Sequence, residues 1–189
     1  MSSFTDTACR PLTLALVGQP NAGKSTLFNA IAGYKTDTGN FPGTSLCCIQ
    51  SDVVVAGRRV RVLDLPGTYA ISPRDATERI TRDSLSFGQA DGLIVVLDAS
   101  VLSRSLELAL QLLELDIPMV VALNMVDEAQ RKGIEVDIPA LEARLGVPVI
   151  PTVATRGIGL VTLLTAAIHR ADHREFGTIP VYDRGLEEA

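Results

Sequence analysis

Short apolar runs alternate along the chain with stretches in which apolar residues recur every three or four positions. Continuous apolar runs are typical of strands buried on both faces of a parallel sheet, and the longer period is typical of amphipathic helices. The runs predict strands at residues 12–17, 46–56, 60–64, 92–98, 119–124 and 147–153. Helices are predicted at residues 24–32, 76–87, 102–115, 129–132, 139–145 and 160–171.

This alternation predicts an α/β fold of three layers, with a mostly parallel sheet of about six strands. A short turn at residues 56–59 joins the second and third strands, so this pair is expected to be an antiparallel hairpin at the sheet edge. The pattern assigns residues 11–171 to one domain, preceded by a tail at residues 1–10. Residues 172–189 are expected to be a linker and the start of a truncated helical domain.

The composition narrows the possible partners. The chain has 189 residues, a formal net charge of −5, 4% aromatic residues and no Trp. An acidic chain with few aromatic side chains lacks the basic surface and stacking platforms of nucleic-acid-binding proteins, so no nucleic-acid partner is expected. Residues 1–10 do not resemble a signal peptide, and no stretch is apolar enough for a membrane span, so the fragment is expected to be soluble.

Residues 18–25 read GQPNAGKS and fit the phosphate-binding pattern GxxxxGK[ST] between a predicted strand and a predicted helix. The glycines let the backbone curl so that its N–H groups point at phosphate oxygens, and the helix N-terminus favours the same charge. Lys24 is expected to reach the β- and γ-phosphates as a catalytic residue, and the Ser25 hydroxyl to ligate Mg²⁺. The expected nucleotide contacts of this P-loop are Gly18, Gln19, Pro20, Asn21, Ala22, Gly23, Lys24, Ser25 and Thr26.

A second segment, DLPG at residues 64–67, follows the third predicted strand. Asp64 lies where a carboxylate is needed for Mg²⁺, usually acting through water. Gly67 can offer its backbone N–H to the γ-phosphate, because no side chain blocks the approach. Leu65 and Pro66 complete this expected contact segment.

The segment NMVD at residues 124–127 follows the fifth predicted strand and indicates the base. The Asp127 carboxylate can accept hydrogen bonds from guanine N1–H and the exocyclic amine, whereas adenine would leave that charge unpaired. Asp127 therefore predicts GTP and GDP as ligands rather than ATP. Met125 replaces the usual Lys beside Asn124, and its side chain can still lie over the base.

The loop after the sixth predicted strand is expected to contact the guanine O6 atom. A backbone N–H of Ala154 or Thr155 can supply this contact, because a main-chain donor does not depend on the side chain. Val153 precedes these two residues and is included in the expected base contacts.

The loop at residues 37–45 is expected to be a switch that closes on the triphosphate state and opens after hydrolysis. Its contact residues are expected to be Gly43, Thr44 and Ser45. Both hydroxyls qualify by chemistry as the ligand that completes the Mg²⁺ shell.

Together these segments resemble the N-terminal G domain of the ferrous iron transport protein B family. The resemblance covers roughly residues 12–171 and rests on runs such as GQPNAGKSTLFN, TGNFPG, DLPGTYAIS and ALNMVDEA. It implies a P-loop GTPase fold, followed by a helical domain and a membrane pore that carries Fe²⁺. It also implies a place on the cytoplasmic face of the bacterial inner membrane.

The resemblance also implies metal ligands. Aligned with the family's switch, the Mg²⁺ hydroxyl falls on Ser45, with Thr44 kept as the alternative, so the Mg²⁺ ligands are expected to be Ser25, Ser45 and Asp64. Relatives with Asn at the position of Asn21 are activated by K⁺, so the resemblance implies that Asn21 is a K⁺ ligand and a catalytic residue beside Lys24 and Gly67. The alternative is that Asn21 only shapes the loop.

Residue 68 is Thr68, where many small GTPases have the Gln that orients the attacking water. A slow basal hydrolysis that rises with K⁺ is therefore expected. One alternative is a free-standing GTPase of the ribosome-assembly or tRNA-modification type, which usually carries a basic RNA-binding module. Another alternative is a nucleotide switch with negligible hydrolysis.

Overall fold

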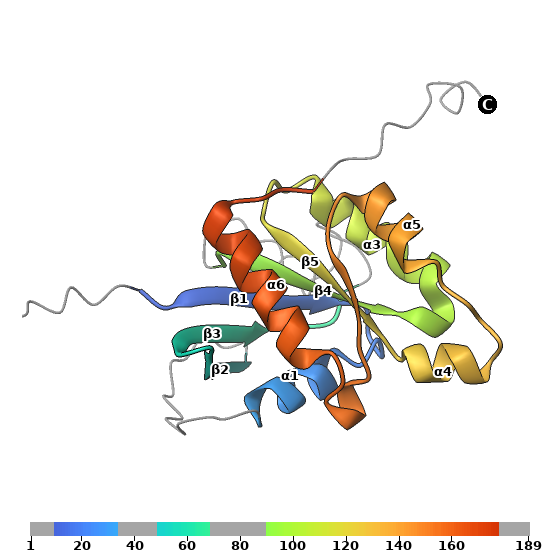
Figure 1. Cartoon of the computed structure of the whole chain (residues 1–189), viewed down its shortest axis with the longest axis horizontal. Helices are drawn as coiled ribbons and strands as arrows, with labels where there is room; N and C mark the ends of the chain where they lie inside the picture. The colour runs from blue at the N-terminus through green and yellow to red at the C-terminus, as the bar shows by residue number, and fades with distance from the viewer. Residues whose placement is uncertain (1–9, 34–48, 69–89, 178–189) are drawn as a thin grey trace, which may run out of the picture.

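The computed structural model describes residues 10–33, 49–68 and 90–177, which form one sheet with helices on both faces (Figure 1). The expected switch at residues 37–45, the helix at 76–87 and residues 178–189 lie outside the described part. Of the expected N-terminal tail, only Arg10 is described.

The sheet confirms the predicted α/β architecture. Its six strands run in the order β2-β3-β1-β4-β5-β6, and every neighbouring pair is parallel except β2 and β3. The strands are β1 (Leu12–Gly18), β2 (Ile49–Val55), β3 (Arg58–Asp64), β4 (Gly92–Asp98), β5 (Met119–Asn124) and β6 (Val149–Pro151).

Central strands are buried on both faces because their alternating side chains feed two separate cores. In β1, Leu14 and Leu16 belong to one core, and Ala15 and Val17 belong to the other. The first core is covered by α1 (Lys24–Ala32) and α6 (Leu160–His173). The second is covered by α3 (Leu102–Leu113), α4 (Val126–Arg131) and α5 (Ile138–Leu145).

The hairpin between β2 and β3 is tighter than predicted. Val55 pairs with Arg58, so only Ala56 and Gly57 form the turn. Both turn residues have positive φ, 49° and 81°, which is the geometry of a type I′ turn and matches the twist of the strands. The prediction that Arg58 and Arg59 belong to the turn is wrong, because these two left-handed residues close the hairpin alone.

Several other boundaries differ from the sequence prediction by one to three residues, and two of them lie near the predicted nucleotide site. Strand β6 ends at Pro151 rather than residue 153, because Thr152 donates its hydroxyl to Asn124 and Val153 pairs instead with Ile158. Helix α4 begins at Val126 rather than residue 129, directly after the left-handed residue Met125. Both changes occur where the chain leaves a strand and enters the region of the predicted nucleotide site.

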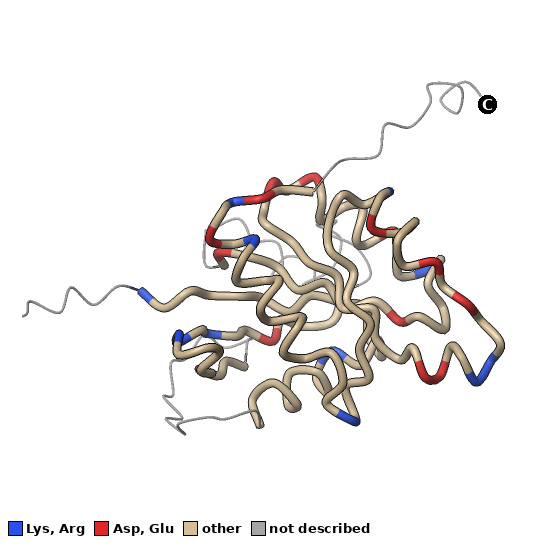
Figure 2. The backbone as a smooth tube through the Cα atoms, viewed as in Figure 1, with Lys and Arg blue, Asp and Glu red and all other residues tan. Residues whose placement is uncertain are grey.

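Positions of basic and acidic residues are interspersed along the described backbone (Figure 2). Within the described ranges, no helix is long and apolar enough to cross a membrane. Short η1 (Ala99–Val101) and η2 (Ala154–Arg156) turns follow β4 and the loop after β6. The strand ends, α1 and these turns bring the predicted contact segments to one edge of the sheet.

Candidate nucleotide-binding site

The P-loop after β1 curls tightly because two of its residues have left-handed backbones. Asn21 has φ 70° and Gly23 has φ 82°. A Cβ at Gly23 would lie 2.3 Å from the side-chain nitrogen of Asn124, so this position has room only for glycine. The loop thus has the close backbone approach that the GxxxxGK[ST] pattern predicts.

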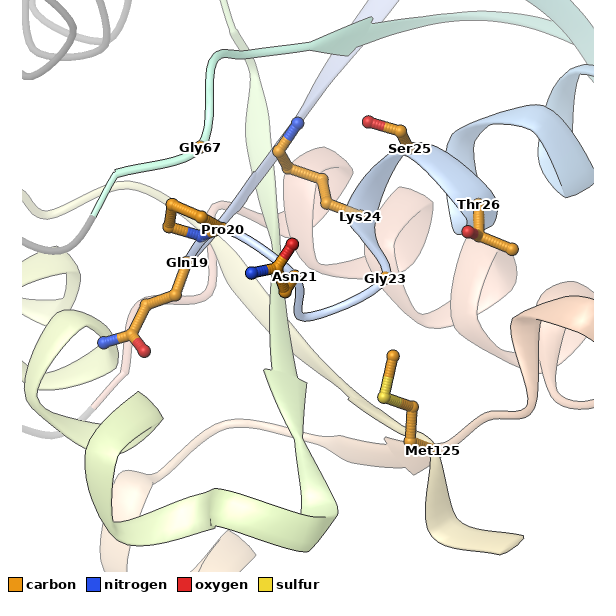
Figure 3. Close-up of a pocket in the computed structure, with 9 residues that line it drawn as sticks. All are labelled: Gln19, Pro20, Asn21, Gly23, Lys24, Ser25, Thr26, Gly67 and Met125. Carbon is orange, nitrogen blue, oxygen red and sulfur yellow. The ribbon is translucent and has the colours of Figure 1, made fainter. Parts of the chain in front are cut away.

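A pocket of about 490 Å³ lies against this loop and the first turn of α1 (Figure 3). Gly67, which follows β3, and Met125, which follows β5, also line it, so three segments distant in sequence converge. The described lining is Gln19, Pro20, Asn21, Gly23, Lys24, Ser25, Thr26, Gly67 and Met125. Because a curled loop and a helix N-terminus face the same space, the pocket is suited to an anion such as phosphate.

Lys24, Ser25 and Asp64 meet at this edge of the pocket. The Lys24 Nζ donates to Asp64 Oδ1, and the Ser25 Oγ donates to Asp64 Oδ2 over 3.2 Å. Lys24 and Asp64 are 8% and 7% exposed, so each charge compensates the other in a poorly solvated place. A hydroxyl and a carboxylate held side by side are oxygen donors that Mg²⁺ prefers, so both residues fit the expected metal role.

The third expected Mg²⁺ ligand, Ser45, lies outside the described residues, as do Thr44 and Gly43. Among the described residues, no three His, Cys, Asp or Glu side chains are grouped to hold a metal. A Mg²⁺ site here therefore needs phosphate oxygens, water or the switch hydroxyl in addition to Ser25 and Asp64.

The DLPG segment packs directly on the P-loop. Leu65 N–H donates to Leu16 O over 3.2 Å, and Thr68 N–H donates to Gly18 O over 3.1 Å. A Cβ at Gly67 would lie 3.3 Å from Pro20 Cα, so a larger residue would push the loop away. Gly67 thus occupies the close position that the γ-phosphate role requires, and Thr68 is buried beside it.

Asn124 joins three loops through one buried amide. Its Nδ2 donates to Ala22 O in the P-loop over 3.1 Å. Its Oδ1 accepts from the Thr152 hydroxyl over 3.3 Å and from Ala154 N–H over 3.1 Å. Asn124 was predicted as a nucleotide contact; in the structure its amide fixes the phosphate loop relative to the loop after β6.

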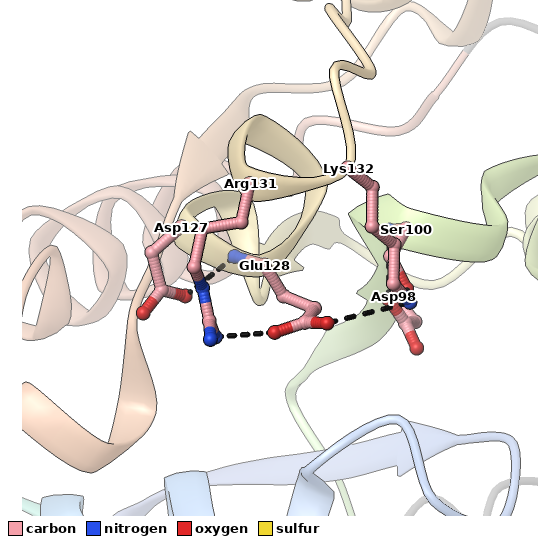
Figure 4. Close-up of polar contacts among 6 residues, drawn as sticks. All are labelled: Asp98, Ser100, Asp127, Glu128, Arg131 and Lys132. Carbon is pink, nitrogen blue, oxygen red and sulfur yellow. Dashed lines mark hydrogen bonds and ion pairs between the residues drawn. The ribbon is translucent and has the colours of Figure 1, made fainter.

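Asp127 and Met125 lie at the start of α4. The Asp127 Oδ1 accepts from Glu128 N–H over 3.0 Å, and its other oxygen has no hydrogen-bond partner among the described residues (Figure 4). Glu128 is paired with Arg131 and Lys132 on the same helix, and Lys132 also donates to Ser100. Lys132, which directly follows α4, thus connects the end of this helix to η1. Asp127 lies two residues after Met125, which lines the pocket.

The loop after β6 separates the two candidates for the guanine O6 contact. Ala154 N–H is committed to Asn124 Oδ1, and Val153 N–H donates to Ile158 O. Thr155 is exposed, and its N–H has no partner among the described residues. Of the two expected donors, Thr155 is the one whose N–H remains for a ligand.

Sequence reasoning missed one residue that shapes the site, Thr152, and one contact of a predicted residue, Gln19. Thr152 is fully buried and donates to Asn124, which a polar residue inside an apolar strand run could have signalled. Gln19 was predicted as a phosphate contact, yet its side chain donates to Arg104 O in α3 over 2.8 Å. No local pattern signals that bond, because its partner is a backbone carbonyl far along the chain.

Comparisons with known proteins agree with this geometry. The family model of ferrous iron transport protein B matches residues 12–167. The chain is 45% identical to the Fe(2+) transporter FeoB of Escherichia coli K12 over 161 residues, which are 83% of this chain and 21% of that protein. The chain therefore spans about a fifth of the length of the curated relatives it matches.

Solved structures are similar over most of the chain. The FeoB G-domain from Methanococcus jannaschii is 34% identical with a TM-score of 0.76, covering 87% of this chain and 99% of that one. NFeoB from S. thermophilus bound to GDP·AlF4⁻ and K⁺ is 36% identical with a TM-score of 0.78, covering 93% of this chain and 68% of that one. From the same source, a point mutant of NFeoB has been solved bound to GDP, and NFeoB has been solved bound to mGMPPNP.

Proposed function

Because the chain belongs to the ferrous iron transport protein B family, we propose that it is a GTP-binding, slowly hydrolysing switch domain that regulates or drives Fe²⁺ uptake by a membrane transporter. The observation that carries the proposal is the convergence of Lys24, Ser25 and Asp64 beside a pocket formed by the P-loop. The GDP·AlF4⁻ and K⁺ complex of the S. thermophilus relative supports the same ligands here.

In the proposed reaction, Lys24 and the P-loop N–H groups bind the β- and γ-phosphates of GTP. Lys24 then exchanges its contact with Asp64 for phosphate oxygens, which releases that carboxylate. Ser25 and Ser45 would hold Mg²⁺ directly, and Asp64 would hold it through water; the bound ion neutralises charge on the phosphates. Gly67 N–H would donate to the γ-phosphate, and its backbone lies against Pro20 of the P-loop, which supports this role.

Asn21 is the proposed ligand for K⁺, which supplies positive charge where other GTPases receive an arginine. Its amide oxygen is a neutral donor, and the residue lines the pocket on the phosphate side. Thr68 is buried, and its N–H is bonded to Gly18, so it does not replace a water-orienting Gln. The basal rate is therefore slow, and it rises with K⁺.

The Asp127 carboxylate is proposed to accept hydrogen bonds from guanine N1–H and the exocyclic amine. Thr155 N–H is the proposed donor to guanine O6. The oxygen of Asp127 that does not bind Glu128 N–H is available for the base. In the whole protein, a helical domain and a membrane pore would follow this domain on the cytoplasmic face of the membrane. The length of the curated relatives beyond this chain supports such further parts.

The hydrolysis proposal is tested by single-turnover GTP cleavage in KCl and in NaCl at equal ionic strength. We expect measurable cleavage in NaCl and a rate at least about tenfold higher in KCl. Equal rates in the two salts would remove the K⁺ role, and absence of cleavage in both would leave a binding switch only.

The base proposal is tested with Asp127→Ala and the matched variant Glu128→Ala, which removes a carboxylate from the same helix. Asp127→Ala should reduce the preference for GTP over ATP by about a hundredfold or more, since the carboxylate that adenine would leave unpaired is removed. Glu128→Ala should keep the preference. Undiminished preference in Asp127→Ala, measured by competition binding, would show that another group reads the base.

A further inference from the structure

Gln19 belongs to the P-loop, but its amide points away from the phosphate side. The side chain is only 7% exposed, and its Nε2 donates to the carbonyl of Arg104 in α3 over 2.8 Å. In Figure 3 the amide extends away from Lys24 and toward a neighbouring helix. This bond therefore joins the phosphate loop to the helix that follows β4.

A second crevice, of about 160 Å³, lies behind the P-loop, on the side of α3. Residues 19–22 form one wall, and Asp98, Val101, Arg104 and Ser105 form the other. A space with this polar lining is suited to water rather than to packed side chains. Among the described residues, packing on this side therefore does little to hold the middle of the loop in place.

The middle of the loop also has an unusual backbone conformation. Asn21 has φ 70°, in the left-handed region that Asn adopts more readily than most L-residues. Side-chain hydrogen bonds anchor the loop on both sides of it, from Gln19 to Arg104 O and from Asn124 to Ala22 O. Asn21 lines both the nucleotide pocket and the crevice, so a shift of the loop toward the crevice would move its amide.

We infer that Gln19 is a positioning residue, whose bond to Arg104 O holds the left-handed Pro20–Asn21 segment over the crevice and so places the Asn21 amide for K⁺. The inference rests on the K⁺ role of Asn21 in the proposed function. Gln19 itself does not touch the ion. Without the tether the loop still binds phosphate through its N–H groups and Lys24, but the Asn21 oxygen is no longer held in one place.

The test uses Gln19→Met, which keeps the length of the side chain and removes the donor. Gln130→Met, an exposed substitution on α4, is the matched control. Single-turnover rates are measured in KCl and NaCl, with the affinity for a GTP analogue in each salt. We expect the KCl-to-NaCl rate ratio to fall about fivefold in Gln19→Met, as for loss of one hydrogen bond. Gln130→Met should keep both the NaCl rate and the salt ratio of the unaltered chain.

A second readout does not depend on activity. Hydrogen–deuterium exchange of residues 18–24 in the nucleotide-free protein should be faster in Gln19→Met and unchanged in Gln130→Met. An unchanged salt ratio would overturn the inference, as would a parallel loss of rate and affinity in both salts. If Gln19→Met does not fold, Gln19→Ala carries the same test. If the unaltered chain showed no K⁺ activation, the result would instead contradict the proposed function. A failure of the Gln19 inference is thus distinguished from a failure of the proposed K⁺ role.

Discussion

At the scale of single residues, Asn124 shows how one side chain can organise a site that it was predicted only to contact. Its amide makes three hydrogen bonds, to the P-loop, to Thr152 and to the loop after β6. The residue is 1% exposed, so these groups have no alternative partner in solvent. The P-loop and the loop after β6 are therefore fixed to each other through this one amide.

Asn124→Ala is expected to destabilise the domain by about 3 kcal/mol, because it leaves buried partners without hydrogen bonds. Urea unfolding of the nucleotide-free protein measures this loss, and GTP affinity should fall in the same variant. Gln130→Ala, on the surface of α4, should be within about 0.5 kcal/mol of the unaltered chain. A neutral Asn124→Ala variant would mean that the three loops do not depend on this amide.

The sequence predicted the meeting of Lys24, Ser25 and Asp64, because the P-loop and DLPG patterns specify chemistry at fixed offsets from strand ends. It did not predict the hydrogen bond from Gln19 to Arg104 O or the hydrogen bond from Ala154 N–H to Asn124 Oδ1. Both depend on which backbone groups of distant segments come within hydrogen-bond range, and that information is not local. The residues whose side chains were expected to face the ligand were therefore easier to predict than those that support them.

At the scale of elements, the central strands were predicted closely and the irregular ends were not. Because β4 and β5 are buried along almost their whole length, they occur in the sequence as apolar runs. The predicted bounds of both strands match the structure. The turn at Ala56 and Gly57 depends instead on two positive φ values, and the end of β6 depends on the Thr152 bond. Periodicity carries no information about either.

Gly57→Ala is expected to destabilise the hairpin by about 1 kcal/mol, because it forces a Cβ into a left-handed conformation. Nothing lies within 4 Å of a Cβ at this position, so the effect is conformational and not steric. Thermal unfolding should show a lower Tm for Gly57→Ala and a smaller decrease for Gly57→Asn, since Asn tolerates the left-handed region. Equal Tm values for all three proteins would contradict this account.

The hairpin is also joined to α6 by an ion pair between Arg58 and Asp172. The hydrogen bond from Arg58 holds the pKa of Asp172 below its ordinary value. This contribution to stability is present above the ordinary Asp pKa and is lost as the pH falls through the lower folded pKa. Asp172→Asn should therefore have a slightly lower Tm than the unaltered chain at pH 6, and the gap should close below about pH 3. Because both side chains are partly exposed, solvent screening limits the contribution of this ion pair to a fraction of a kcal/mol.

At the scale of the whole molecule, Arg170 controls how the chain leaves the domain. It is 9% exposed, and its guanidinium donates to Glu175 O over 3.2 Å and to Phe176 O over 2.7 Å. Burial lowers the pKa of Arg170, although it remains charged near neutral pH. A Cβ at Gly177 would lie 2.2 Å from Leu113 and 2.8 Å from Val147, so the exit segment, residues 174–177, is held against the body of the domain.

Arg170→Met is expected to release the exit segment and to destabilise the domain by about 2 kcal/mol, since the carbonyls of Glu175 and Phe176 lose a charged donor. Limited proteolysis should cut the variant near residues 174–177 faster than the unaltered chain. Arg174→Met removes an exposed arginine from the same segment and should leave the cleavage rate unchanged. Equal cleavage of both variants would mean that apolar packing alone holds the segment.

The position of β1 in the sheet has a consequence for the order of events during synthesis. β1 is made early, yet Leu12 pairs with Val60 and Leu14 pairs with Gly92, so its neighbours leave the ribosome much later. Such non-local pairing slows folding, because the long intervening loops must close first. The P-loop grows from the end of β1, and its anchor Asn124 ends β5. A nascent chain therefore gains a fixed P-loop only after β5 has emerged, so nucleotide binding reports that β5 has joined the sheet, whereas β6 is made later.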